Sequence, residues 1–387
     1  MTSKFWSVSG ETSSSDESGG ENENSLESND KHLGIFGASE GEVTDPNLAW
    51  KAIQEKQVFL SPLVSTTSRR SDCVRIVCIS DTHGKHRDVH LPAGDILLHG
   101  GDFTKSGEVG SISELSAYFR CCGFSEVICI AGNHDMTLQP SYYQRNWNRF
   151  HREPFNCEKA KDALRNCIYL EDSSYTTRQG IEIYGSPWSP DFFNWAFNLP
   201  RGGPCKEAWK KIPKSTDVLI THGPPLGRGD KTQENGHAGC YDLMVAVQER
   251  VKPRVHVFGH IHEAAGVTFD GETLYVNASS LNIAYQVAHF PVILDVPRDK
   301  GKQAMVVPPD CSLESHNLAQ WLKKKKFDRI LHLLNDCDPE LLPSGNEFFT
   351  EGAYEDLCSA LKTHRDRNAS HELRVALSKL YAESFAS

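Results

Sequence analysis

Five separate segments of the chain carry side chains of the types that can bind divalent metal ions. They supply aspartate, asparagine and histidine, as Asp81-Thr82-His83, Gly101-Asp102, Asn133-His134-Asp135, His222-Gly223-Pro224 and His260-Ile261-His262. Such oxygen and imidazole donors suit manganese, iron, zinc or nickel. On extended segments Asp81 and His83 would point to the same side, as would His260 and His262. The spacing therefore predicts a site for a pair of metal ions.

A pair of metal ions defines the chemistry to expect. The two ions of such hydrolases lie about 3.5–4 Å apart, and Asp102, which follows two glycines that let backbones approach closely, is the candidate bridging carboxylate. The ions keep a net positive charge after two aspartates and a hydroxide are counted, so they attract a phosphate ester anion. Monoesters and diesters would both be attracted, and electrostatics leaves that choice open.

The metal-binding segments follow short apolar runs typical of buried strands. The predicted strands are Val74–Ser80, Ile96–His99, Val127–Ala131, Ile168–Leu170, Ile181–Gly185, Val218–Thr221, Val255–Gly259, Leu274–Asn277 and Val292–Val296. Ligands bind beyond the carboxyl ends of strands in an open α/β sheet, so the five segments should meet in one crevice. His99 and His256 lie inside strands, and we expect them to be packing residues.

Helical patterns alternate with these strands. We expect helices over 45–56, from a capping box at Ser111–Glu114 to a stop at Gly123, and over 241–251. The alternation predicts a four-layer α/β/β/α sandwich over 34–311. Residues 1–33 are rich in Ser and acidic residues and are predicted to be a disordered tail. Residues 312–387 are predicted to form a small helical extension, which offers a surface for a protein partner.

Composition restricts the partners and the compartment. The formal charge of −10 argues against a dedicated nucleic-acid binder, which needs a basic surface. Residues 1–30 contain no long apolar run, so we expect no secretory signal peptide, and we expect no segment that spans a membrane. The twelve cysteines form no C-x-x-C pair and read as reduced residues. We therefore expect a cytoplasmic protein without membrane contact.

The ordered motifs D-x-H, G-D, G-N-H-D, H-G-P-P and G-H-x-H resemble those of the calcineurin-like metallophosphoesterase superfamily. Further segments resemble the metallophosphoesterase-domain-containing proteins related to brain protein 239, over about residues 45 to 298. These segments are Asp45–Trp50, Val77–His83, Gly185–Trp188, Phe197–Gly202, Thr221–Gly227 and Tyr275–Ser279. The resemblance implies the four-layer metallophosphoesterase sandwich.

The resemblance also implies roles for the matching residues. One metal would be held by Asp81, His83, Asp102 and His262, and the other by Asp102, Asn133, His222 and His260. His134 would be the general acid, with Asp135 orienting it. His260 completes the second metal site, which some members of the subfamily lack. The implied cofactors are two divalent ions, with Mn²⁺ ahead of Fe, Zn, Ni or Mg.

The implied activity is that of a metal-dependent phosphoric diester hydrolase. A bridging hydroxide would attack small phosphodiesters, with 2′,3′-cyclic nucleoside monophosphates as the leading substrates. Asn133, His134, Trp188 and Arg201 are the predicted substrate contacts. Trp195 and Phe197 could stack on a base together with Trp188, although these three rings could equally form a structural cluster over the sheet edge. Arg228, like Arg201, is a candidate phosphate contact.

Three alternatives are weighed against this activity. The first is a nucleotide-binding scaffold or regulatory protein with low turnover. A protein serine/threonine phosphatase is disfavoured, because Asp102 is followed by Phe-Thr-Lys and Asn133 by His-Asp. A nuclease is disfavoured by the acidic composition.

Overall fold

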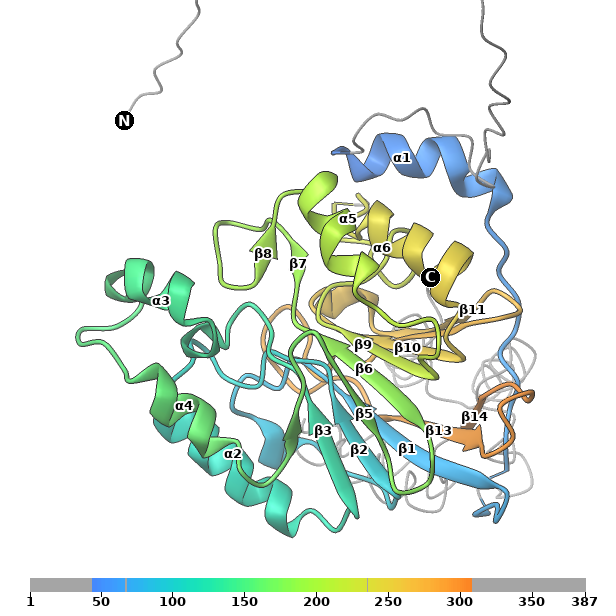
Figure 1. Ribbon diagram of the computed structural model, residues 1–387, viewed down its shortest axis with the longest axis horizontal. Coiled ribbons are helices and arrows are strands. Elements are labelled where there is room, and N and C mark those ends of the chain that lie inside the picture. The colour runs from blue at the N-terminus through green and yellow to red at the C-terminus, as the bar shows by residue number, and fades with distance from the viewer. Residues whose placement is uncertain (1–43, 67, 235, 308–387) are drawn as a thin grey trace, which may run out of the picture. The chain divides into compact units, whose positions relative to one another are not determined.

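Two six-stranded sheets form the centre of the fold (Figure 1). The computed structural model describes residues 44–66, 68–234 and 236–307, so the predictions for 1–33 and 312–387 lie outside the described residues. The first sheet has the order β14-β13-β1-β2-β3-β4. Its strands are β1 Cys73–Ile79, β2 Ile96–His99, β3 Glu126–Cys129, β4 Ile168–Tyr169, β13 Val292–Pro297 and β14 Met305–Val307.

The second sheet has the order β11-β12-β10-β9-β6-β5. Its strands are β5 Ser173–Thr176, β6 Glu182–Ser186, β9 Val218–Thr221, β10 Val255–Phe258, β11 Gly266–Phe269 and β12 Leu274–Asn277. A further short pair, β7 Ser189–Pro190 and β8 Asn198–Leu199, lies outside both sheets. All nine predicted strands are present. The sequence did not reveal β5, β7, β8, β11 and β14, which are short or partly polar strands at or beyond the edges of the sheets.

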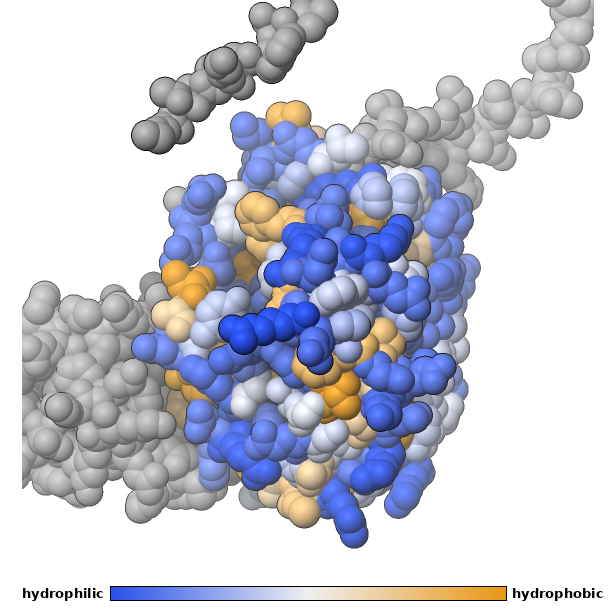
Figure 2. Space-filling view, turned by 90° about the vertical axis from the view of Figure 1, so that its left-hand side faces the viewer, coloured by the Kyte–Doolittle hydropathy of each residue, from blue (hydrophilic) through white to orange (hydrophobic). Residues whose placement is uncertain are grey.

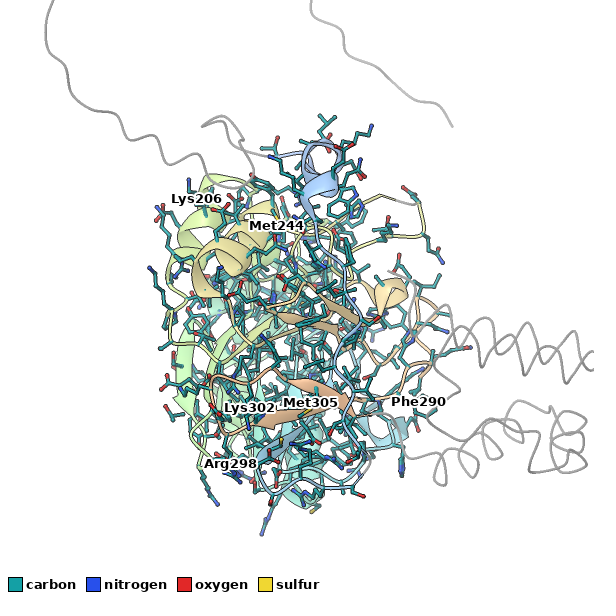
Figure 3. The ribbon with its side chains drawn as sticks, turned by 90° about the vertical axis from the view of Figure 1, so that its right-hand side faces the viewer. Lys206, Met244, Phe290, Arg298, Lys302 and Met305 are labelled. Atoms are coloured by element: carbon teal, nitrogen blue, oxygen red, sulfur yellow. The ribbon has the colours of Figure 1, made fainter. Side chains whose placement is uncertain are left out.

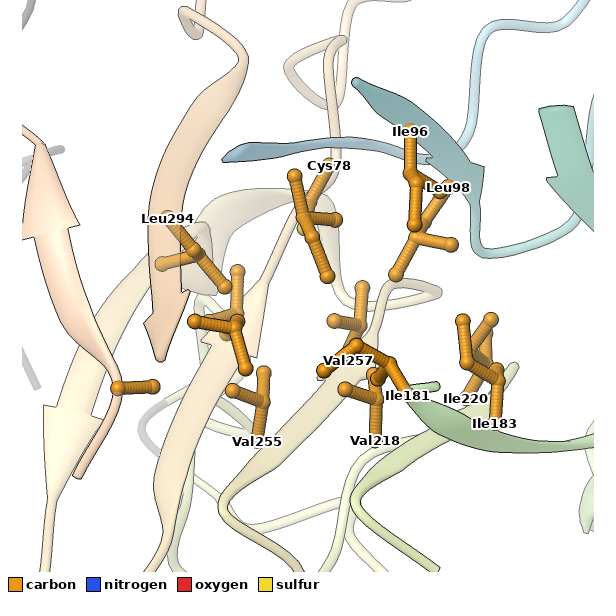
Figure 4. Packing of buried hydrophobic residues seen from close by; sticks show 14 of the residues in the cluster. Cys78, Ile96, Leu98, Ile181, Ile183, Val218, Ile220, Val255, Val257 and Leu294 are labelled. Atoms are coloured by element: carbon orange, nitrogen blue, oxygen red, sulfur yellow. The ribbon is translucent and has the colours of Figure 1, made fainter. Parts of the chain in front are cut away.

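The main core lies between the two sheets (Figure 4). Cys78, Ile96 and Leu98 of the first sheet face Val218 and Val257 of the second, and all five side chains are fully buried. The other sides of the sheets are covered by helices. The helices are α1 Pro46–Ile53, α2 Val109–Cys121, α3 Pro140–Asn146, α4 Cys157–Ala163, α5 Gly203–Lys210 and α6 Tyr241–Val245.

The helices complete the predicted layers. A second apolar cluster joins α2, α3 and α4 to the first sheet, and a third joins α5 and α6 to the second sheet. This arrangement confirms the α/β/β/α sandwich. Figure 3 shows Lys206 of α5 and Met244 of α6 at one end and Met305 of β14 at the other. None of the helices in the described residues is long and apolar enough to cross a membrane.

Local sequence explains where the helices begin and end. Asp45 caps α1, because its carboxylate accepts hydrogen bonds from the backbone N–H groups of Asn47 and Leu48. The predicted capping box at Ser111 is wrong, because α2 already begins at Val109 and Ser111 lies inside it. Gly123 follows the last turn with a φ of 85°, which confirms the predicted stop. After α6 the chain continues as a π-helix over Ala246–Val251.

One segment, residues 57–65, crosses an edge of each sheet, and we call it the strap. The Leu60 N–H donates to the carbonyl of Phe269 in β11, and the Ser65 N–H donates to the carbonyl of Val306 in β14. Arg228 holds the strap through hydrogen bonds to Gln57 and to the Val58 carbonyl. Its guanidinium carbon lies over two rings, 4.1 Å from the centroid of Phe59 and 4.9 Å from the centroid of Tyr275. The strap therefore belongs to the folded unit.

One face of the surface is shown in Figure 2, which looks at the left-hand side of Figure 1. Hydrophilic residues predominate there, and hydrophobic residues lie in small separate groups between them. Such a surface is usual for a soluble globular chain, where single exposed apolar residues need no special explanation.

Candidate dinuclear metal centre

The five predicted segments meet where strands of both sheets end. β1, β2 and β3 are parallel neighbours in the first sheet, and β9 and β10 are parallel neighbours in the second. The two sheets are joined at this edge by direct bonds. Asp81 accepts from the His260 backbone N–H at 3.0 Å and from the Ser279 hydroxyl at 2.9 Å. The loops after β1, β10 and β12 thus form one structure.

The ligand-type atoms lie in three overlapping groups, each within 4.8 Å. The groups are Asp81, His83 and His262; His83, Asp102 and His134; and Asp102, His222 and His260. His83 and Asp102 each belong to two of the groups, and Asp102 is the carboxylate that is shared, as a bridging carboxylate would be. The Asn133 carboxamide oxygen is 2.9 Å from Nε2 of His222. All seven predicted metal-binding residues are therefore brought together.

Three of the imidazoles are oriented by backbone carbonyls. Nδ1 of His83, His222 and His262 lies 3.1, 3.0 and 3.2 Å from the carbonyl oxygens of Thr104, Gly100 and Asn282, respectively. A carbonyl can only accept, so Nδ1 carries the proton in each ring and Nε2 presents its lone pair. This is the outer hydrogen bond that metal-binding histidines commonly make.

The Nε2 atoms of these rings converge on one another and on Asp102. Nε2 of His83 is 3.3 Å from Nε2 of His262, and Nε2 of His222 is 3.3 Å from a carboxylate oxygen of Asp102. Acceptors so close repel one another unless a proton or a cation lies between them. The buried nitrogen and oxygen donors therefore fit divalent ions of the borderline type.

The pKa values of the imidazoles differ with their surroundings. Burial lowers the pKa of His83 to about 4 and that of His260 to about 3, so both rings are neutral near pH 7 and can offer lone pairs. Burial also disfavours the charged form of His222, but Asp102 and Asp81 outweigh this and raise its pKa to about 9. Negative charge at this point attracts a proton and would equally attract a metal cation, so the two compete.

The backbone around the site differs from the expected extended segments. Asp81, His83, Asp102 and His260 all have left-handed conformations, with φ between 42° and 70°. Left-handed residues other than glycine are strained by about 1–2 kcal/mol each. The loops after β1 and β2 hold them in place, because the N–H groups of Asp81 and His83 bond to the carbonyls of Gly101 and Asp102 at 3.0 Å. The side chains still converge, through turns instead of strand alternation.

Two glycines are required by close approach. A Cβ on Gly132 would lie 2.2 Å from an oxygen of Asp102, and a Cβ on Gly259 would lie 2.0 Å from an oxygen of Asp81. Any other residue at these positions would displace a carboxylate that belongs to the candidate site. The glycine of the G-N-H-D segment and that of the G-H-x-H segment are thus part of its construction.

His134 lies beside the three groups with its ring fixed. Its Nδ1 is 2.7 Å from the Lys105 carbonyl, and its backbone N–H donates to Asp102 at 2.7 Å. The ring packs on Trp195, with centroids 4.1 Å apart. The Asp135 carboxylate, which was predicted to orient this ring, accepts from the N–H groups of Phe103, Thr104 and Gly132 and from the Thr104 hydroxyl.

Asp135 therefore holds together the two loops that carry Asp102 and His134. Burial, together with the neighbouring charge of Asp102, raises its pKa to about 7, while its donors from Thr104 and Gly132 oppose the rise. The partners of Asp135 depend on a loop contact between distant segments that no local pattern reveals.

The other predicted substrate contacts are engaged elsewhere. The guanidinium of Arg201 donates to the carbonyls of Ala238 and Gly239, and the indole of Trp188 donates to Asp172. Arg228 is buried under the strap, and Phe197 is fully buried. Sequence reasoning missed two rings that do reach the site. Phe192 lies 5.4 Å from His260, and Tyr285 lies 4.9 Å from His83.

Comparisons with known proteins agree with the motifs. The family model described as calcineurin-like phosphoesterase matches residues 74–264. Human metallophosphoesterase domain-containing protein 1 is 44% identical over 254 residues, which cover 63% of this chain and 77% of the relative. A UPF0046 protein of Caenorhabditis elegans is 38% identical over 270 residues, which cover 65% of this chain and 68% of the relative.

A search of solved structures found a dimetal phosphatase from Danio rerio at 9% identity and a TM-score of 0.35. The match covers 64% of this chain and 99% of that one.

Proposed function

The chain belongs to the calcineurin-like metallophosphoesterase family, and on that premise we propose that it is a dinuclear-metal phosphodiesterase. The observation that carries the proposal is the convergence of lone pairs. Seven nitrogen- and oxygen-bearing side chains meet, and three imidazoles have their Nδ1 protons bound to backbone carbonyls. The arrangement suits cations, which the family typically binds in pairs.

Each ion would have its own set of ligands. We propose that one is held by Asp81, His83, Asp102 and His262, and the other by Asp102, Asn133, His222 and His260, as the three ligand groups suggest. The mixed imidazole and carboxylate set suits Mn²⁺, our first choice, and also Fe, Zn or Ni. When bound, such ions supply positive charge that polarises a phosphoryl oxygen and activates water.

His134 is proposed to protonate the leaving oxygen. The Lys105 carbonyl accepts its Nδ1 proton, and the Trp195 ring packs along one face of the imidazole. Only Nε2 is then free to carry a proton toward a substrate. This ring is partly exposed, unlike His83 and His222, as a residue that contacts substrate must be. Asn133 is proposed to contact substrate beside it.

The substrates are proposed to be small phosphodiesters, with 2′,3′-cyclic nucleoside monophosphates as the leading candidates. A monoanionic diester needs less positive charge than a monoester dianion. The site already holds two buried carboxylates, Asp81 and Asp102, which offset part of the charge of two divalent ions. This balance attracts monoesters as well, so the choice of the diester follows from what the resemblance of the motifs implies.

The metal assignment is tested with Asp102→Asn and His222→Ala. We expect each variant to lose at least about 100-fold in Mn²⁺-dependent kcat/KM on bis(p-nitrophenyl) phosphate, because a missing ligand lowers metal occupancy and Lewis acidity. Bound metal is measured on the same samples by plasma mass spectrometry. His90→Ala is the matched control, because His90 is exposed in the loop after β1. Full activity in either site variant contradicts the assignment.

A further inference from the structure

Two exposed aromatic side chains border the candidate metal centre from different loops. Phe192 comes from the loop between β7 and β8, and its ring lies 5.4 Å from that of His260. Tyr285 comes from the loop between β12 and β13, and its ring lies 4.9 Å from His83 and 5.5 Å from His262. One ring thus adjoins the ligand group of each proposed ion.

Both rings keep a large surface in contact with solvent. Phe192 is 47% exposed and Tyr285 is 43% exposed. They meet the ligand imidazoles edge to face, at interplanar angles of 85°, 70° and 72°. Neither ring belongs to the three apolar clusters formed by the described residues. Core packing therefore does not account for two large apolar side chains at this place.

The loops that carry these rings are held by their own hydrogen bonds. The Phe192 N–H donates to the Asn198 side chain at 3.1 Å, and the Tyr285 N–H donates to the Asn282 carbonyl at 2.8 Å. Lys85, from the loop after β1, donates to the Tyr285 carbonyl. The rings are consequently presented beside the site by anchored backbone, which lowers the entropy lost when a ligand packs on them.

We propose, resting on the proposed function, that Phe192 and Tyr285 form an aromatic rim that selects phosphodiesters bearing a planar aromatic group. The phosphate would lie among the ligand groups while the ring of one ester group packs on the rim. Aromatic side chains favour planar partners over alkyl groups of similar area. Two kinds of substrate share this chemistry, aryl phosphodiesters and nucleotides, in which the ring is the base.

The test uses pairs of substrates in which one member has an aromatic group that the other lacks, a non-leaving phenyl ester or a base. For aryl esters, p-nitrophenyl phenyl phosphate is compared with methyl p-nitrophenyl phosphate, because both release the same leaving group. For nucleotides, adenosine 2′,3′-cyclic monophosphate is compared with ribose 2′,3′-cyclic phosphate, which lacks the base. The quantity measured is the ratio of kcat/KM within each pair, in the full-length Mn²⁺-loaded protein. If the protein prefers the aromatic member in just one of the two pairs, that pair shows whether the rim selects aryl esters or nucleotide bases.

The variants are Phe192→Leu and Tyr285→Leu, which keep apolar bulk but remove the ring. We expect each to lower the ratio by about three- to tenfold in at least one pair, with little change in kcat/KM for the partner that lacks the phenyl group or the base. Phe290→Leu is the matched control. Phe290 is 49% exposed, and among the described residues no aromatic ring is close to it. It should leave the ratios unchanged.

Either of two results overturns the rim. In the first, both variants have the same kcat/KM ratios as the wild type. In the second, kcat/KM falls equally for both members of each pair. Binding of phenylphosphonate against methylphosphonate, measured by calorimetry, keeps the rim testable without turnover. If the protein hydrolyses none of the substrates but binds phenylphosphonate more tightly than methylphosphonate, and Phe192→Leu abolishes that preference, the phosphodiesterase is rejected and the rim is kept. Active enzyme with no aromatic preference in any assay would reject the rim and keep the phosphodiesterase.

Discussion

Single atoms decide what the candidate site can do. The N–H groups at Nδ1 of His83, His222 and His262 donate to backbone carbonyls. A change in a loop that carries one of these carbonyls would rotate the imidazole, so that Nε2 would no longer point at the metal site. His134 is fixed in the same way by Lys105. The site is therefore set by main-chain positions as much as by the identity of its side chains.

The role of His134 gives a prediction about leaving groups. His134→Ala should reduce kcat by about 10²–10⁴ for diesters with alkoxide leaving groups, which need a proton as they depart. The same variant should lose much less on p-nitrophenyl esters, whose leaving group is stable as an anion. Metal content should match that of the wild type, measured by plasma mass spectrometry. An equal loss on both classes of ester would remove the general-acid role.

The glycine at position 132 gives a second prediction. In Gly132→Ala the new methyl would lie 2.2 Å from Asp102 and 2.6 Å from His222, so we expect metal occupancy to collapse together with activity. Gly110→Ala is the control, because its methyl would meet nothing within 4 Å inside α2. That control should be stabilised by about 0.5–1 kcal/mol in urea unfolding. Normal metal binding by Gly132→Ala would show that the loops can move apart.

The position of the candidate site could be predicted from the sequence mainly because the strands could be predicted. The apolar runs that became β1, β2, β3, β9 and β10 end next to the ligand segments, so the meeting point of the site followed from sheet topology. Loop conformation did not follow, because left-handed residues such as Asp81 carry no sequence signal. Phe192 and Tyr285 were missed for the same reason: each lies in a loop whose path depends on tertiary contacts.

The contact between the strap and Arg228 gives a prediction for one element. Arg228→Met should lower the free energy of unfolding by about 2–4 kcal/mol, because it removes two hydrogen bonds and a cation that lies over two rings. Arg87→Met is the control, since that side chain is 59% exposed in its pair with Glu114 and should cost under about 1 kcal/mol. Urea unfolding measures both. Similar losses in the two variants would show that the strap is loosely held.

Buried histidines make the stability of the whole molecule depend on pH. Burial lowers the pKa of His99 and of His256 to about 3, against about 6.5 in an unfolded chain. Between these values the unfolded chain binds a proton that the folded chain does not. Stability from these groups is therefore complete above pH 6.5 and is lost as the pH falls toward 3.

We expect the free energy of unfolding to fall more steeply with decreasing pH in the wild type than in His256→Gln. The variant should reduce the slope of unfolding free energy against pH by up to about 1.4 kcal/mol per unit below pH 6.5. Urea unfolding between pH 7.5 and 5, with a chelator present to remove metal effects, measures it. His90→Gln, at an exposed position, should keep the wild-type slope. Identical slopes in all three proteins would mean that His256 titrates normally.

The strap also bears on how copies of the chain behave toward one another. It covers β11 and β14, each of which is the last strand at one edge of its sheet. An open edge strand offers unpaired N–H and C=O groups to a second molecule, and that is a common start of aggregation. Residues 57–65 occupy those groups at Phe269 and Val306, so the same segment that completes the fold also limits sheet extension between molecules. Solubility at high concentration should accordingly depend on how tightly the strap is bound.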